Sequence, residues 1–185
     1  ILSAVSVASI DTASVRVNPS TGAATLAWGS VDKTANAWGR IERTGNTTGW
    51  NVLDIGTTEA STGTNITAAY YAAGYLEAAL TCTEISQFSR NNDDTKQSAA
   101  VSKFAKESHA WTAAMARGTY SQQNVTDYWS AVKHTLAQFA GVVDGYNTVC
   151  SAKSPTWQPL SADEMFLMQV GRLLLSRACN TDAPT

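Results

Sequence analysis

The hydrophobic pattern of this sequence changes its period once, near residue 65, and that change limits the folds that the chain can adopt. Before it, apolar and polar side chains alternate in "SVRV" and "ATLAW", on either side of the turn "NPSTG". This pattern predicts a β-hairpin. The segments "AWGRIER" and "GWNVLDIG" flank "TGNTTG" in the same way and predict a second hairpin. We therefore expect residues 1–60 to be rich in strands.

Beyond this point the apolar residues follow helical spacing, and we predict helices near residues 65–82, 96–117, 127–150 and 162–178. The fourth opens with Ser161-Ala-Asp-Glu164, a capping box. Strands followed by helices predict an α+β fold, in a single domain over residues 1–185 with its helical part at 65–178. The third helix has the clearest apolar face, formed by Trp129, Val132, Leu136, Phe139, Val143, Tyr146 and Cys150.

The first predicted helix contains "AAYYAAGYLEAALT", residues 68–81, with six Ala, one Gly and a single charged residue, Glu77. Small side chains let another backbone approach closely, so we expect a tight contact on this helix. A buried carboxylate needs a partner, and we predict that Glu77 is buried and paired with Arg40 or Arg43. A structural ion pair is the simpler interpretation, and the alternative is that Glu77 orients a catalytic group supplied from elsewhere.

The composition favours a secreted protein over a cytosolic one. Charged residues make up 15% of the chain, against roughly 25% on average, and the net charge of −2 gives no reason to expect nucleic acid as a partner. No apolar run approaches the ~20 residues of a transmembrane helix. The first residue, Ile1, fits a chain that begins after a cut. The Asn-x-Thr triplets at Asn46, Asn65 and Asn124 are predicted glycosylation sites.

The residues that carry chemistry in known motifs are absent or scattered. Cys82, Cys150 and Cys179 predict one disulfide with a free thiol, or a bridge to another chain, and their pairing stays open. Without a CxxC pair or a Cys/His cluster we expect no metal site, and the isolated His109 and His134 are interpreted as helix-packing residues. No G-x-S-x-G, H-E-x-x-H or glycine-rich phosphate loop occurs, so we expect no cofactor and no catalytic residue in this chain.

The six tryptophans are more typical of a hydrophobic core than of a ligand-binding cleft. We expect most of them to be buried, and Trp157, in the loop "SPTWQP", to be the one that is exposed or docks on something outside this chain.

Four stretches in order resemble the phospholipase B-like family, also called laminin-ancestor-like proteins: "TGWNVLDIGTT", "YAAGYLEAALT", "DYWSAVKHTLAQFAGVVDGY" and "FLMQVGRLL". The resemblance runs from about residue 15 to 178. The positions that match the family pattern are Gly49, Trp50, Gly74, Glu77, Thr81, Tyr128, Trp129, Gln138 and Gly141.

The resemblance implies a secreted or lysosomal glycoprotein with the N-terminal-nucleophile hydrolase fold, an αββα sandwich. In that family a precursor cuts itself in two, and the second chain begins with the nucleophilic Cys. This sequence resembles the first chain only, so the resemblance implies an incomplete domain completed by a second chain and a hydrolase of acyl esters or amides of lipids. It also implies that helix 68–81 packs across a sheet whose other strands belong to that partner.

Two alternatives stay open from the sequence. The first keeps the fold but gives the enzyme a non-lipid amide as its substrate. The second is a secreted, non-catalytic binding module that uses its tryptophans as a contact surface.

Overall fold

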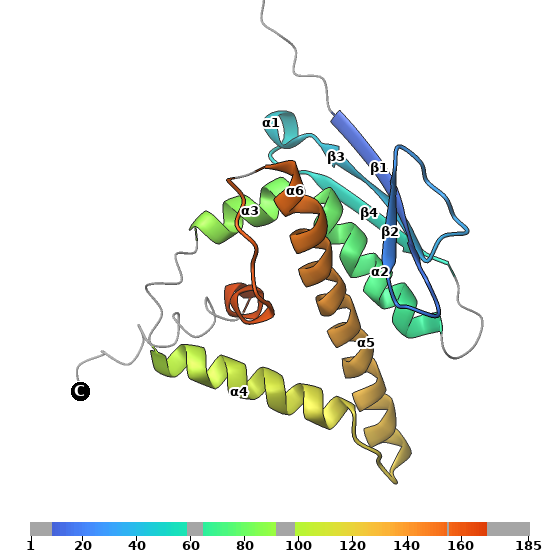
Figure 1. Cartoon of the computed structure of the whole chain (residues 1–185), viewed down its shortest axis with the longest axis vertical. Coiled ribbons are helices and arrows are strands. Elements are labelled where there is room, and N and C mark those ends of the chain that lie inside the picture. Colours follow the sequence, from blue (N-terminus) through green and yellow to red (C-terminus); the bar gives the residue numbers. More distant parts are fainter. Residues whose placement is uncertain (1–8, 59–64, 92–98, 155, 170–185) are drawn as a thin grey trace, which may run out of the picture.

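The computed structural model describes residues 9–58, 65–91, 99–154 and 156–169. It is an α+β structure, in which helices pack on one face of a four-stranded antiparallel sheet (Figure 1). The strands are β1 (Ser9–Val17), β2 (Ala24–Trp28), β3 (Ala37–Arg43) and β4 (Val52–Thr57), in the order β2-β1-β3-β4. Both predicted hairpins are confirmed, since β1 pairs with β2 and β3 pairs with β4.

The connection between β3 and β4 is more structured than a simple turn. Residues of "TGNTTG" form the short helix α1 (Gly45–Thr48), which ends at Gly49 with φ of 83°. This left-handed conformation favours glycine, because other residues would strain the backbone.

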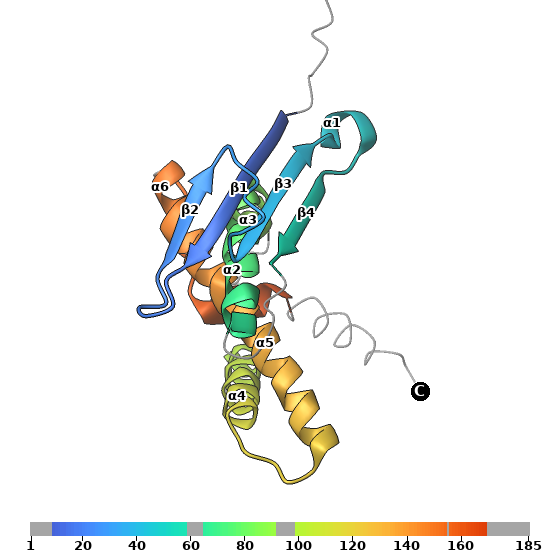
Figure 2. The ribbon, with the colours of Figure 1, turned by 90° about the vertical axis from the view of Figure 1, so that its right-hand side faces the viewer.

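Helix α2 (Asn65–Leu80) lies between the sheet and helix α5 (Gln123–Gly145), so the described residues form three layers (Figure 2). Alternate side chains of the strands face α2, and they build the main core. This core consists of Ala13, Val15, Ala37, Ile41, Ala72, Tyr75, Leu76 and Leu80.

The tight contact expected on α2 is made by α5 of the same chain. A Cβ atom at Gly141 would lie 2.0 Å from the carbonyl oxygen of Tyr71, and one at Gly145 would lie 2.5 Å from that of Tyr75. Real Cβ atoms do not come so close, so both positions require glycine. Helix α2 packs across the sheet of this chain, and its glycine face meets α5. That further strands of this sheet belong to a partner chain stays a prediction.

The remaining helices follow the predicted pattern with one addition. Helix α3 (Cys82–Asn91) was not predicted; it is separated from α2 at Thr81, whose hydroxyl donates to the carbonyl oxygen of Glu77 at 2.7 Å. Helix α4 (Ala99–Ala116) is confirmed, and α5 continues into the π-helix η2 (Tyr146–Cys150) and the short α6 (Ser151–Lys153).

A last helix covers residues 162–169, and its predicted extension to residue 178 lies outside the described residues. The capping box at its start is confirmed. The Ser161 backbone N–H and hydroxyl both donate to the Glu164 carboxylate at 2.6 Å, and the Glu164 N–H donates to the Ser161 hydroxyl at 3.2 Å.

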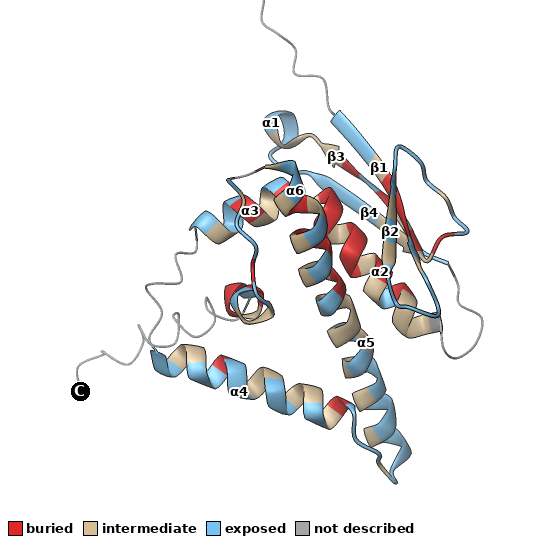
Figure 3. Ribbon diagram, in the orientation of Figure 1, coloured by how far each residue is buried: buried red, intermediate tan, exposed pale blue. Residues whose placement is uncertain are grey.

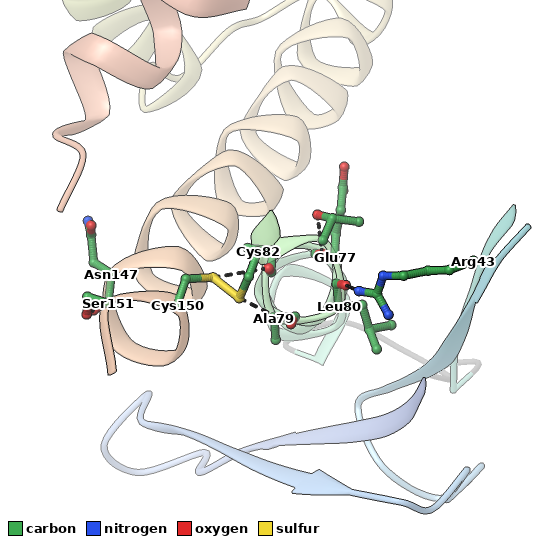
Figure 4. The surroundings of a disulfide bond; sticks show 10 residues. Arg43, Glu77, Ala79, Leu80, Cys82, Asn147, Cys150 and Ser151 are labelled. Atoms are coloured by element: carbon green, nitrogen blue, oxygen red, sulfur yellow. Dashed lines mark hydrogen bonds between the residues drawn. A yellow bond between two sulfur atoms is a disulfide. The ribbon is translucent and has the colours of Figure 1, made fainter. Parts of the chain in front are cut away.

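A disulfide joins Cys82, at the start of α3, to Cys150, at the end of η2 (Figure 4). It settles the pairing of two of the three cysteines, and Cys179 lies outside the described residues. The bridge belongs to a second core between α2, η2 and the last helix. This core contains Ala78, Cys82, Tyr146, Cys150, Leu160, Met165 and Met168.

The tryptophans are less buried than predicted. Exposed fractions are 78% for Trp50, 60% for Trp111 and 43% for Trp28, so the core interpretation is wrong for these three. Figure 3 shows that buried segments gather on α2 and on the strands β1 and β3 beside it. Trp157 is half-buried against the second core, so the prediction that this tryptophan is exposed or docks outside the chain is wrong.

Candidate functional site

Glu77 is half-buried on α2, and its carboxylate faces α5. Its Oε2 atom accepts a hydrogen bond of 3.4 Å from Nε2 of Gln138. The predicted pairing with an arginine is wrong. Arg40 lies on the opposite face of the sheet, where its Nε is 3.7 Å from Oδ2 of Asp54.

Arg43 makes other contacts that keep it from Glu77. Its guanidinium donates to the carbonyl oxygen of Leu80 at 2.8 Å (Figure 4), pairs with Asp11, and lies 3.4 Å from Oε1 of Glu84. A cation at the last carbonyl of a helix is favoured by the hydrogen bond and by the helix dipole. Arg43 therefore binds the end of α2 to the sheet rather than neutralising the carboxylate in its middle.

A pocket of about 360 Å³ opens beside Glu77, between α2, α3 and the last helix. Glu77 and Glu84 line the same side of this pocket. Oε1 of Glu84 accepts a 3.0 Å hydrogen bond from Asn51, and Oε2 of Glu84 is buried without a hydrogen-bond partner. The remaining wall is mainly apolar. It contains Ile85, Phe88, Val142, Met165 and Met168.

Glu84 is a site residue that the sequence analysis missed. It follows Glu77 by seven residues, which is the spacing of one helix face, so a helix that continued beyond residue 82 would have brought it into consideration.

A second polar bridge joins α2 to α5 and was also missed. The hydroxyl of Tyr71 donates to Oδ2 of Asp144 at 2.7 Å. Partial burial, together with this hydrogen bond, raises the pKa of Tyr71. Tyr71 and Glu77 lie on either side of Gly74 on α2, so the two bridges flank the glycine contact and fix the helices against rotation.

Both histidines pack as predicted. The His109 ring stacks on Phe166 with centroids 4.9 Å apart and meets the edge of Phe139 at 5.6 Å. His134 stacks on Tyr70 at 5.1 Å. Within the described part of the chain neither histidine hydrogen-bonds to a Ser, Thr or Cys side chain, and no group of His, Cys, Asp and Glu could hold a metal ion.

Two of the predicted glycosylation sites are exposed. Asn46 lies in α1 and Asn124 lies in the first turn of α5. Asn65 begins α2, and its side chain is outside the description.

Together these features define an α+β structure in which helices and the pockets between them cover one face of an antiparallel sheet. A family model, Phospholipase B, matches residues 37–174, and the chain belongs to this family. Family membership confirms the resemblance and assigns the chain to the phospholipase B-like hydrolases, whose chemistry is lipid degradation. Comparison with curated proteins gives no match. No helix in the described ranges is both long and apolar enough to cross a membrane.

Proposed function

We propose that this chain is the non-nucleophilic amino-terminal chain of a phospholipase B-like hydrolase that cleaves acyl esters or amides of lipids. A second chain of the same precursor, beginning with Cys, completes the domain and supplies the nucleophile. The chain then forms the helix-covered half of an αββα sandwich.

The open face of the sheet carries this proposal. The side chains that alternate with the core residues point away from α2, and Ile10, Glu42 and Val52 form one row across three strands. Ile10 is 54% exposed and Val52 is 52% exposed. Exposed apolar side chains on a sheet face favour a further layer, and a second sheet from the partner chain would bury this row.

Part of this face is already covered by the loop at residues 29–36. The Ser14 hydroxyl donates to the carbonyl oxygen of Ser30 at 2.9 Å and accepts from the N–H of Asp32 at 2.8 Å. A partner sheet would therefore pack beside this loop, over the rows nearer to β4.

The cysteines support a nucleophile on the other chain. A thiolate is required for attack on an acyl carbonyl, and Cys82 and Cys150 are joined in a disulfide. In the proposed reaction the partner's first Cys attacks the carbonyl while its own α-amine accepts the thiol proton. Hydrogen-bond donors stabilise the resulting oxyanion.

The decisive experiment is an intact-mass measurement of native protein, followed by N-terminal sequencing. We expect a co-purifying larger chain that begins with Cys, labelled at that residue by a thiol-alkylating reagent with loss of hydrolysis. Ser variants of Cys82, Cys150 and Cys179 should retain activity in a folded complex, and the 185-residue chain alone should have none. Turnover by the isolated chain would overturn the proposal.

A secreted binding module is the second candidate, favoured by the exposure of Trp50 and Trp111. A stable 19.6 kDa monomer in native material would support it. A non-lipid amidase is separated from the lipid hydrolase by comparing acyl amides with phospholipids as substrates of the same complex.

We further propose a lysosomal or secreted glycoprotein. The exposure of Asn46 and Asn124 supports modification there, and Asn65 is the third candidate. Glycopeptide mass spectrometry of native protein should find glycan on at least Asn46, and three unmodified sites would contradict the secretory route.

A further inference from the structure

Two cationic side chains on the helical side of the described residues have no partner. The side chains of Arg117, just after α4, and Lys133, on α5, form no ion pair, hydrogen bond or ring contact, whereas those of every other Lys or Arg in the described ranges do. The partnered ones are Arg16, Lys33, Arg40, Arg43, Arg90, Lys103, Lys106 and Lys153. Arg117 and Lys133 line the same pocket.

That pocket, of about 440 Å³, lies between α4 and α5. A second pocket of about 700 Å³ lies between α5, α2 and the β1–β2 turn. The two share Thr67, Ala137 and Ala140 as lining residues, so they form one continuous groove, here called the α5 groove. Along α5 it runs from Lys133 to Asp144, a distance of about 16 Å at the helical rise.

Beyond the two cations the α5 groove is mainly apolar. Its other ionisable groups are already engaged: Asp144 accepts the hydroxyl of Tyr71 at 2.7 Å, and the His109 ring stacks on Phe166. The apolar lining consists of Val17, Pro19, Ala68, Ala113, Ala116, Leu136, Ala137, Phe139, Ala140, Val143 and Ala162. The groove thus has a cationic end and an apolar length.

The lining distinguishes between two kinds of anionic occupant. A bound peptide strand would bring backbone N–H and C=O groups that need hydrogen-bond partners. Most of the lining belongs to helices, whose backbone groups are paired within the helix and whose alanine side chains offer no donor or acceptor. In the β1–β2 turn, the Asn18 N–H donates to the carbonyl oxygen of Ala23 at 2.9 Å, and the Asn18 carbonyl oxygen accepts from the Gly22 N–H at 2.8 Å. An alkyl chain has no such requirement and gains from burial of each methylene.

We propose that the α5 groove binds a long-chain fatty acid, with its carboxylate at Arg117 and Lys133 and its alkyl chain along Ala137 and Ala140. The two unpartnered cations would pair with the carboxylate head group, and the apolar lining of the groove would contact the alkyl chain. Such binding does not depend on which chain performs hydrolysis.

The test is isothermal titration of the native protein, with all its chains, using sodium dodecanoate below its micelle concentration. We expect saturable binding of dodecanoate and none of sodium acetate, which has the head group without the tail. The double variant R117Q/K133Q should weaken dodecanoate binding about tenfold, since it removes two charge-assisted contacts at a partly exposed site. Dodecanol, which has the tail without the charge, should bind the double variant as it binds wild type.

Two further variants complete the design. Lys103→Gln, on α4 but ion-paired to Glu107 at 3.7 Å, is the matched charge control and should bind dodecanoate as wild type does. Ala140→Phe fills the groove and should weaken both dodecanoate and dodecanol. If Ala140→Phe does not fold, the double charge variant still decides the question.

Absence of saturable dodecanoate binding, or equal affinity in wild type and R117Q/K133Q, would overturn the proposal. A third outcome would also overturn it: wild type binds no dodecanoate, and Ala140→Phe causes the chains to dissociate. That result would indicate that a segment of the partner chain occupies the groove.

Discussion

Gly74 of α2 lies directly against the backbone of Gln138 of α5, where a Cβ atom on residue 74 would stand 1.9 Å from the carbonyl oxygen of residue 138. Gly141 and Gly145 make the same kind of approach to α2. The atoms in contact belong to two helix backbones and cannot rotate away as a side chain can. The position of α5 on α2 therefore depends on these glycines.

We predict that Gly74→Ala lowers the free energy of unfolding by about 3 kcal/mol through overpacking, measured by urea denaturation. Gly45→Ala is the matched control. A Cβ atom there would meet Oδ1 of the Asn51 side chain at 3.0 Å and no backbone atom. Asn51 accepts from the Gly45 N–H at 3.0 Å and would have to shift by a few tenths of an ångström, so the loss should stay below about 1 kcal/mol. Equal stability of the two variants would contradict the close packing of α2 on α5.

The local features of the fold were predictable from the sequence because they depend on neighbouring residues. Alternation around "NPSTG" predicts the β1–β2 hairpin, and the Ser161–Glu164 spacing predicts the capping box; both are confirmed. The short helix at residues 45–48 and helix α3 were missed. Their sequences are polar, and α3 follows α2 after a break of a single residue.

The long-range features of the site were not predictable. Small residues at 72–74 indicate a close approach but do not name the partner, which is α5. Arg43 was a reasonable partner for Glu77 by charge, but the C-terminal carbonyl of Leu80 and two other carboxylates bind it instead. Which acceptors Arg43 binds depends on where α2 ends above the sheet, and the sequence pattern does not predict that position.

Glu77 provides the second prediction. Its contact with Gln138 is a single 3.4 Å hydrogen bond at a half-buried position, and a glutamine side chain can keep a hydrogen bond to that amide. We expect Glu77→Gln to change the free energy of unfolding by less than about 1 kcal/mol. A double-mutant cycle of Glu77→Ala with Gln138→Ala should give a coupling of about 0.5–1 kcal/mol. A loss of several kcal/mol in Glu77→Gln would instead indicate a buried ion pair.

The disulfide provides the third prediction. Cys82 and Cys150 are separated by 68 residues, and closing a loop of that length restricts the unfolded chain by about 4 kcal/mol in the chain-entropy model. We expect dithiothreitol to lower the urea midpoint of wild type strongly. The double variant Cys82→Ser/Cys150→Ser should start at the lower midpoint and be insensitive to the reductant. A midpoint that does not change on reduction of wild type, with both thiols shown free by alkylation, would contradict this role.

Asp32 provides a prediction about pH. The hydroxyl of Thr34 donates to its carboxylate at 2.7 Å, the Thr34 N–H at 2.9 Å, and Arg16 at 2.5 Å. These contacts lower the pKa of Asp32 from 3.8 to about 2.

A pKa that is lower in the folded state stabilises the fold at pH values above the unfolded pKa. This stabilisation is lost as pH falls from about 4 towards 2. We therefore expect Asp32→Asn to melt below wild type at pH 6, with the difference in Tm shrinking on acidification to a small remainder at pH 2, where the folded carboxyl group is about half protonated. Thr34→Val, which removes one donor and keeps the side-chain shape, should show a smaller change of the same sign. A Tm difference between Asp32→Asn and wild type that is the same at pH 6 and pH 2 would show that the carboxylate gains nothing from these contacts.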